Sequence, residues 1–154
     1  MLLQYLFRRF FKVPRKINFL KTVDEDFSKV FDQIANFENY SSFIPGCAKS
    51  ELIEKQDKFE IGKLDFDFLF KDYSIKSKNI LSDNLIKIEQ IDGPFKYFTG
   101  EWRVEDKNDS KTLIEFNAEF ELPFFLNNLL PEKVIDKFCE SMIDAFIKRL
   151  SKNS

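Results

Sequence analysis

Polar and apolar side chains alternate along much of residues 47–122, which predicts a series of β-strands. The clearest alternation lies in residues 112–122, where the polar set is mostly glutamate. Its inward-facing positions are expected to be Ile114, Phe116, Ala118, Phe120 and Leu122. One apolar face and one hydrated face are typical of an antiparallel sheet. Residues 15–23 are predicted to form a first strand ahead of this series.

Apolar residues recur at helical spacing in two segments that flank the predicted strands. In residues 22–37, Phe27, Val30, Phe31 and Ile34 predict an amphipathic helix, followed by a short helix or turn that ends at Pro45-Gly46. About twenty residues after Pro131 predict a longer helix with a wide apolar stripe. The order of strand, two helices, five or six antiparallel strands and terminal helix indicates an α+β fold.

Two glycines mark places where the sheet is expected to bend. Phe59 and Ile61 share one parity, whereas Leu64 and the next phenylalanines share the other, so a β-bulge is predicted at Gly62. Gly100 is expected to allow curvature or close backbone approach in a later strand. A bent sheet around one long helix encloses a cavity unless large side chains fill it.

Residues 91–105 contain the only tryptophan of the chain. Gly93-Pro94 is a turn signal, because proline fixes φ and glycine permits positive values. Trp102 shares its parity with Phe98 and Val104 and is expected on the concave face. The pattern leaves open whether its ring fills the core or lines a cavity.

Composition excludes several classes of chemistry. The 154 residues predict one domain and include no histidine, so Ser-His or Cys-His catalysis and imidazole metal ligands are absent. The cysteines, Cys47 and Cys139, are too few for a structural zinc site or a disulfide framework, and the four glycines do not form a phosphate loop. Cys47 has no imidazole to activate it and is expected to be a small apolar wall residue. No enzymatic activity, catalytic residue or metal site is predicted.

Charge divides the chain into two parts. Residues 1–23 contain six basic and no acidic side chains, and since the whole chain carries −2, residues 24–154 carry −8. Residues 1–14 are expected to form a basic amphipathic arm that docks on an anionic membrane, the contact being made by residues 1–13. An organellar presequence and an arm folded onto the domain are the alternatives. The domain itself, residues 15–154, has no basic stripe, so no DNA binding is expected.

Four segments resemble the coenzyme Q-binding START-type family. They are "FDQIANFENYSSFIPGCAKSELIE", "DGPFKYFTGEWRVE", "IEFNAEFE" and "MIDAFIKRL", in the family's order, within residues 16–150. The most specific is the Gly-Pro-Phe-Lys-x-Phe-x-Gly-x-Trp motif. One departure is Gly46, which stands where the family usually has tryptophan and is expected to loosen the cavity wall.

The resemblance implies a helix-grip fold, shared with START lipid carriers and polyketide cyclases, with a hydrophobic cavity. It further implies that the protein binds ubiquinone or a similar isoprenoid lipid without catalysing a reaction, in support of respiratory electron transport. The alternative is a RatA-type protein, which associates with the ribosome and modulates subunit joining. The expected location is the bacterial inner-membrane surface facing the cytoplasm, or the matrix side of the mitochondrial inner membrane.

The candidate ligand-binding residues are those expected to line this cavity. Among them, Gln90 is the polar side chain considered for a hydrogen bond to a quinone carbonyl, with a solvent-exposed strand end as its alternative role. The full set is Phe43, Pro45, Cys47, Phe66, Phe68, Phe70, Ile88, Gln90, Phe95, Phe98, Trp102, Phe116, Phe120, Val134, Phe138 and Met142.

Overall fold

The computed structural model describes residues 14–68 and 71–152 and contains one seven-stranded antiparallel sheet. The strands are β1 (Arg15–Val23), β2 (Cys47–Lys55), β3 (Phe59–Phe68), β4 (Lys71–Leu81), β5 (Leu85–Asp92), β6 (Tyr97–Asp106) and β7 (Thr112–Glu121). Their order is β1-β7-β6-β5-β4-β3-β2, so β2 to β7 form a meander and β1 joins β7 at one edge.

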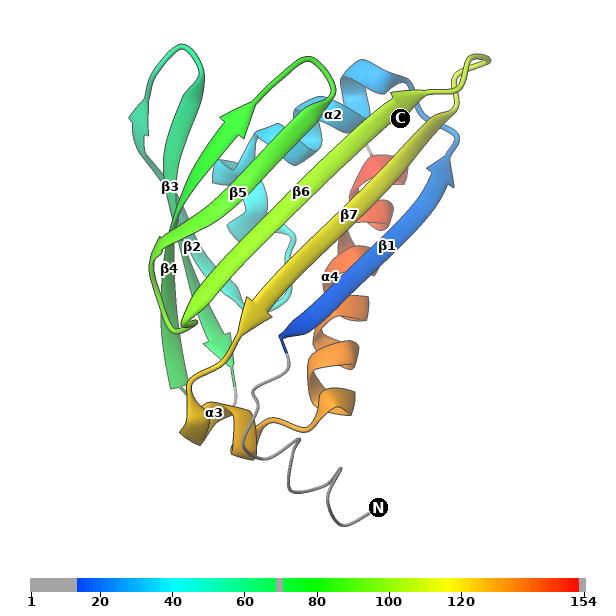
Figure 1. Cartoon of the computed structure of the whole chain (residues 1–154). Coiled ribbons are helices and arrows are strands. Elements are labelled where there is room, and N and C mark those ends of the chain that lie inside the picture. Colours follow the sequence, from blue (N-terminus) through cyan, green and yellow to red (C-terminus); the bar gives the residue numbers. More distant parts are fainter. Residues whose placement is uncertain (1–13, 69–70, 153–154) are drawn as a thin grey trace.

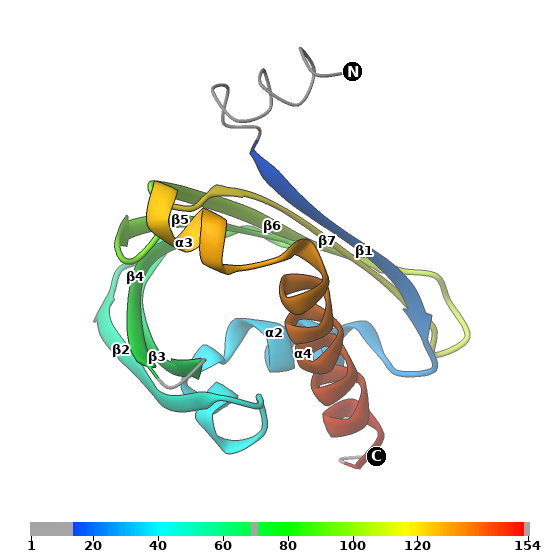
Figure 2. The same ribbon diagram turned by 90° about the horizontal axis from the view of Figure 1, so that it is seen from below.

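Within the described residues, four helical segments accompany the sheet: α2 (Phe27–Ala35), the 3₁₀ segment η1 (Phe37–Ser42), α3 (Phe124–Leu129) and α4 (Glu132–Lys152). The sheet curls around α4, with α2 and η1 at one end of the concave side and α3 at the other (Figures 1 and 2). This arrangement confirms the α+β helix-grip fold. The short helix α3 was not predicted from the sequence.

The alternation in the later strands places the expected residues on the concave face. Ile114 and Phe120 in β7 are buried, as are Trp102 and Val104 in β6. Trp102 lies directly opposite Phe116 in the β6–β7 register, so the two rings face the same side of the sheet. The parity predicted for these strands is confirmed.

The predicted bulge in β3 at Gly62 was wrong. β3 pairs with β4 without a register shift, and the extra residue lies on the neighbouring strand β2, between Leu52 and Glu54. Leu52 is the partner of Gly62. The bulge therefore lies next to the predicted position, but in β2 instead of β3. Gly62 has a different role, because an added Cβ would lie 2.4 Å from the ring of Phe37.

Buried side chains form two separate hydrophobic clusters. The larger one joins α2, η1, the sheet and the C-terminal half of α4, and includes Val30, Tyr40 and Phe146. The smaller one gathers around α3 and includes Leu126 and Phe120. The concave side is therefore packed at both ends.

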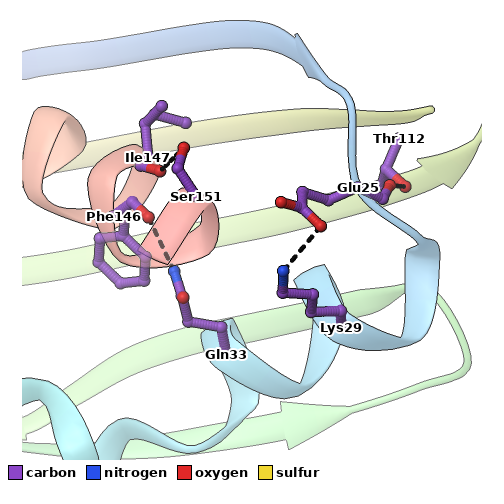
Figure 3. A network of polar contacts seen from close by, with 7 residues as sticks. All are labelled: Glu25, Lys29, Gln33, Thr112, Phe146, Ile147 and Ser151. Atoms are coloured by element: carbon purple, nitrogen blue, oxygen red, sulfur yellow. Dashed lines mark hydrogen bonds and ion pairs between the residues drawn. The ribbon is translucent and has the colours of Figure 1, made fainter. Parts of the chain in front are cut away.

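Polar contacts fasten α2 to the elements beside it (Figure 3). Thr112 Oγ1 donates a 2.6 Å hydrogen bond to the carbonyl of Glu25, and Glu25 forms a 2.8 Å ion pair with Lys29. Gln33 Nε2 donates to the carbonyl of Phe146 in α4 at 2.9 Å. These bonds fix α2 between the sheet and the terminal helix.

Thr112→Val should destabilise the fold by about 1–3 kcal/mol, because it leaves the Glu25 carbonyl without its partner in a buried place. Thr112 is fully buried, whereas Thr99 is exposed on β6 and provides a matched Thr→Val control. Urea denaturation of both variants measures the difference. Equal unfolding midpoints would show that the Thr112 hydrogen bond contributes nothing to stability.

Candidate functional site

A cavity of about 300 Å³ lies between the sheet and α4. Its wall includes members of both hydrophobic clusters, so it occupies the space between the two packed ends. The volume is at the lower limit of small-molecule pockets, which range over roughly 300–1,000 Å³. Most of the lining residues are apolar, which suits the apolar body of a ligand.

Nearly every structural element contributes to this wall. From the sheet come residues at alternate positions, as pleating requires. From α4 come residues of its apolar stripe, namely Ile135, Phe138, Cys139, Met142, Ile143 and Phe146. α3 closes one end with Leu126, and η1 contributes Tyr40 near the other.

Ten of the candidate residues border the cavity. They are Phe66, Phe68, Ile88, Phe95, Phe98, Trp102, Phe116, Phe120, Phe138 and Met142. Trp102 is only 9% exposed and packs on Phe116 and Phe146, with ring centroids 4.5 and 5.4 Å away. Its ring therefore belongs both to the core and to the cavity wall. Contact of these residues with a ligand stays a prediction.

Five other candidates do not border the cavity, and Phe70 lies outside the described residues. Phe43 stacks edge-on against Tyr40 and Phe146 behind the wall. Pro45 is exposed, and Val134 does not border the cavity although it is half-buried. Both Phe43 and Pro45 lie in the connection from η1 to β2, of which only Ile44 borders the cavity.

Cys47 is buried in the larger cluster rather than exposed in the cavity. Its Sγ donates to the carbonyl of Lys49 at 3.6 Å. Burial, helped by the Asp65 carboxylate, raises the pKa of the thiol to about 11. Burial likewise raises the pKa of Cys139, which borders the cavity, to about 11. Both thiols are thus protonated at neutral pH, and the described residues contain no cluster suited to a metal ion.

Gln90 has the expected parity but not the expected role. Its Nε2 donates to the carbonyl of Phe95 at 2.9 Å, and its Oε1 accepts from the amide of Phe95 at 3.2 Å. An added Cβ on Gly93 would lie 2.3 Å from that Oε1, so glycine makes room for the side chain. Gln90 thus closes the turn between β5 and β6 and places Phe95 against the cavity.

Gly46 does not border the cavity, contrary to the expectation that it loosens the wall. Its φ is +79°, and an added Cβ would approach the carbonyl oxygen of Asp67 to 3.0 Å. A residue with a side chain would be strained there. Glycine at this position serves the turn into β2.

Three polar lining residues were missed: Glu60 in β3, and Ser77 and Asn79 in β4. Glu60 has the same parity as Gly62 and Leu64, which also border the cavity. The bulge predicted at Gly62 had assigned Glu60 to the opposite face of the sheet. Ser77 and Asn79 share their parity with the lining residue Ile75. A continuous alternation through β3 and β4 would have pointed to all three.

The outer side of α3 is apolar as well. Phe124, Phe125 and Leu129 are 61%, 58% and 69% exposed, while Leu126 and Leu130 of the same segment face the cavity. These two apolar sides of α3 were not predicted, because the helix is too short to show a helical period in the sequence.

A family model described as polyketide cyclase/dehydrase and lipid transport matches residues 23–147. The chain belongs to this family. A curated relative, the ribosome association toxin RatA of Rickettsia prowazekii, is 29% identical over 134 residues, covering 79% of this chain and 86% of the relative.

Solved structures of other proteins show the same fold. The ZhuI aromatase/cyclase from Streptomyces sp. R1128 superposes with a TM-score of 0.79 at 17% identity, over 91% of this chain and 95% of that one. A START superfamily protein from Mycobacterium smegmatis gives 0.77 at 13% identity, over 90% and 99%. These likenesses show the fold, and the family match over residues 23–147 confirms the resemblance to the START-like superfamily.

Phe138→Ala should cost only about 1–2 kcal/mol of stability, less than the 3–5 kcal/mol typical of a filled core, because the ring borders empty space. Phe138 contacts Phe68 and Phe66, at centroid distances of 4.9 and 6.1 Å. Phe146→Ala is the comparison, since that ring, although it also borders the cavity, is buried and packs against Tyr40, Phe43 and Trp102.

Urea denaturation of the two variants tests this ranking. A cost for Phe138→Ala equal to or greater than that for Phe146→Ala would mean that the space beside Phe138 is filled in solution.

Proposed function

We propose that the protein binds an isoprenoid lipid of the ubiquinone class and carries it without chemical conversion. The cavity between the two hydrophobic clusters is the observation that supports this function. An apolar hollow in an otherwise packed domain loses dispersion contacts unless a ligand fills it. The raised thiol pKa values and the absence of histidine favour a carrier over an enzyme.

The cavity volume limits which part of such a lipid is enclosed. At about 300 Å³ the cavity is at the lower limit of small-molecule pockets. A substituted ring of similar volume is enclosed, and most of an isoprenoid tail lies outside. The protected part of the ligand is therefore its head.

We further propose that the lipid enters at the α3 end from a membrane surface. Phe124, Phe125 and Leu129 supply exposed apolar area there. Arg15, at the start of β1, donates from Nη2 to Asn127 Oδ1 and to the Leu130 carbonyl, both at 2.9 Å. The basic segment 1–13 thus joins the described chain beside α3, and an anionic surface at the cytoplasmic or matrix side would attract it.

A second candidate function is association with the ribosome. It is supported by the similarity to RatA, a ribosome association toxin, over 79% of this chain. Binding of lipid and binding to ribosomal subunits are separable by experiment.

Organic extraction of the purified protein, followed by mass spectrometry, tests the carrier function. We expect an isoprenoid quinone at up to one molecule per chain. Sedimentation with ribosomal subunits tests the second candidate. Co-sedimentation without any extractable or titratable lipid would replace the carrier function by ribosome association.

Removing residues 1–13, or replacing Phe124 and Phe125 by serine, should each weaken binding to vesicles that contain anionic lipid. Removal of residues 1–13 should act through charge and reduce the free energy of membrane binding by roughly 1 kcal/mol per basic residue. Its effect should disappear at high salt. The second should act at all salt concentrations, because it removes apolar area.

Vesicle flotation at two salt concentrations measures both effects. Leu20→Ser on β1 is the control, because Leu20 is 66% exposed but lies on the sheet rather than on α3. Binding that is unchanged in both variants would refute docking at the α3 end.

A further inference from the structure

The three polar lining residues form a compact group on an otherwise apolar wall. Glu60 and Asn79 are direct partners in the β3–β4 register, and Ser77 is the partner of Gly62 one pleat further along. Directly paired residues on one face have Cβ atoms about 4.5–5.5 Å apart. Glu60, Ser77 and Asn79 are called the polar strip below.

Asn79 presents a hydrogen-bond donor to the cavity. The residue is only 8% exposed, and its Oδ1 accepts a 3.0 Å hydrogen bond from Ser77 Oγ. This bond fixes which end of the amide is the acceptor. Within the described part of the chain, nothing accepts a hydrogen bond from Nδ2, and this atom is not fully enclosed by protein, so on the cavity wall it is open to a ligand.

Glu60 presents an acceptor opposite that donor. Its side chain is 13% exposed, and Oε1 lies 3.6 Å from Nζ of Lys55, whose own side chain is 71% exposed. Among residues 14–68 and 71–152, no group donates a hydrogen bond to Oε2. The pair therefore leaves one carboxylate oxygen free to accept from a ligand.

We propose that the polar strip binds a hydroxyl group on the head of the lipid; this inference rests on the proposed carrier function. The O–H donates to Glu60, and the same oxygen accepts from Asn79 Nδ2. A carbonyl or ether oxygen satisfies only Asn79 and brings a lone pair towards the carboxylate. A fatty acid brings a second negative charge.

The cavity consequently selects alcohols, phenols and quinols over the corresponding ethers, carboxylates and quinones. For a ubiquinone-class ligand, the reduced form is the one retained. Hydrogen bonds to a charged group are stronger than neutral ones, and the preference for the hydroxyl is expected to be about tenfold or more in Kd.

Farnesol, its methyl ether, farnesoic acid and the hydrocarbon farnesene share one tail and differ in the head. Titration of the wild-type protein should rank farnesol first by about tenfold over the ether. A short-tailed ubiquinol should likewise bind more tightly than its quinone under anaerobic conditions. If farnesoic acid binds most tightly, its carboxylate pairs with Lys55, and the proposal is overturned.

Two variants assign the roles within the strip. Glu60→Met should weaken farnesol binding about tenfold and leave the ether unchanged, which removes the difference between them. Asn79→Leu should weaken both ligands alike. Glu89→Met is the matched control, because Glu89 is exposed on the outer face of β5. Melting curves of each variant show that it is folded.

The outcomes separate this inference from the carrier function. If farnesol, its ether and farnesene bind with equal Kd, the cavity binds lipid but the polar strip does not distinguish the head groups. If the difference in Kd between farnesol and its ether persists in Glu60→Met, its cause is steric. That result would also refute the proposed role of the polar strip. If none of the probes binds, the carrier function fails, and the inference fails with it.

Discussion

The constraint on which this structure depends is the filling of a strongly curved sheet by a single long helix. An α-helix with its side chains is about 10–12 Å across, and α4 crosses a concavity formed by seven strands (Figure 2). One helix cannot contact the whole of such a surface. Additional elements must pack at its ends, and the middle stays open unless large side chains occupy it.

The chain meets this constraint by packing the two ends separately. At one end, Phe37 lies on Gly62 and Phe146 is surrounded by Tyr40, Phe43 and Trp102. At the other end, α3 supplies a small cluster of its own. Stability is thereby concentrated where no ligand is needed, and the middle of the fold is left for binding. The polar contacts of α2 reinforce the larger cluster (Figure 3).

The fold was predictable because strand parity and helical spacing are local signals. β7 alternates without interruption, and the α4 stripe is wide, so both elements and their inner faces follow from the sequence. α3 was not predictable in this way, because six residues with apolar side chains on both sides have no period to detect.

Errors in the candidate site have non-local causes. Gln90 has the correct parity, but its partner is the backbone of Phe95, which only the turn brings close. The phase of β3 was misread because the bulge lies in β2, across the register from Gly62. That misreading hid Glu60. Phe43, Pro45 and Cys47 were expected on the wall, whereas in the folded chain only Ile44 of this stretch borders the cavity and Cys47 is buried in the larger cluster.

Charge separates the two candidate functions more sharply than fold does. Nucleic-acid binding derives much of its free energy from basic side chains that neutralise phosphates. Residues 24–154 carry −8, so this part of the chain would be repelled by ribosomal RNA. Ribosome association would then depend on the six basic residues of 1–23 or on contact with ribosomal protein. The proposed lipid binding requires neither, because the cavity is apolar and the proposed partner of the same basic segment is an anionic membrane.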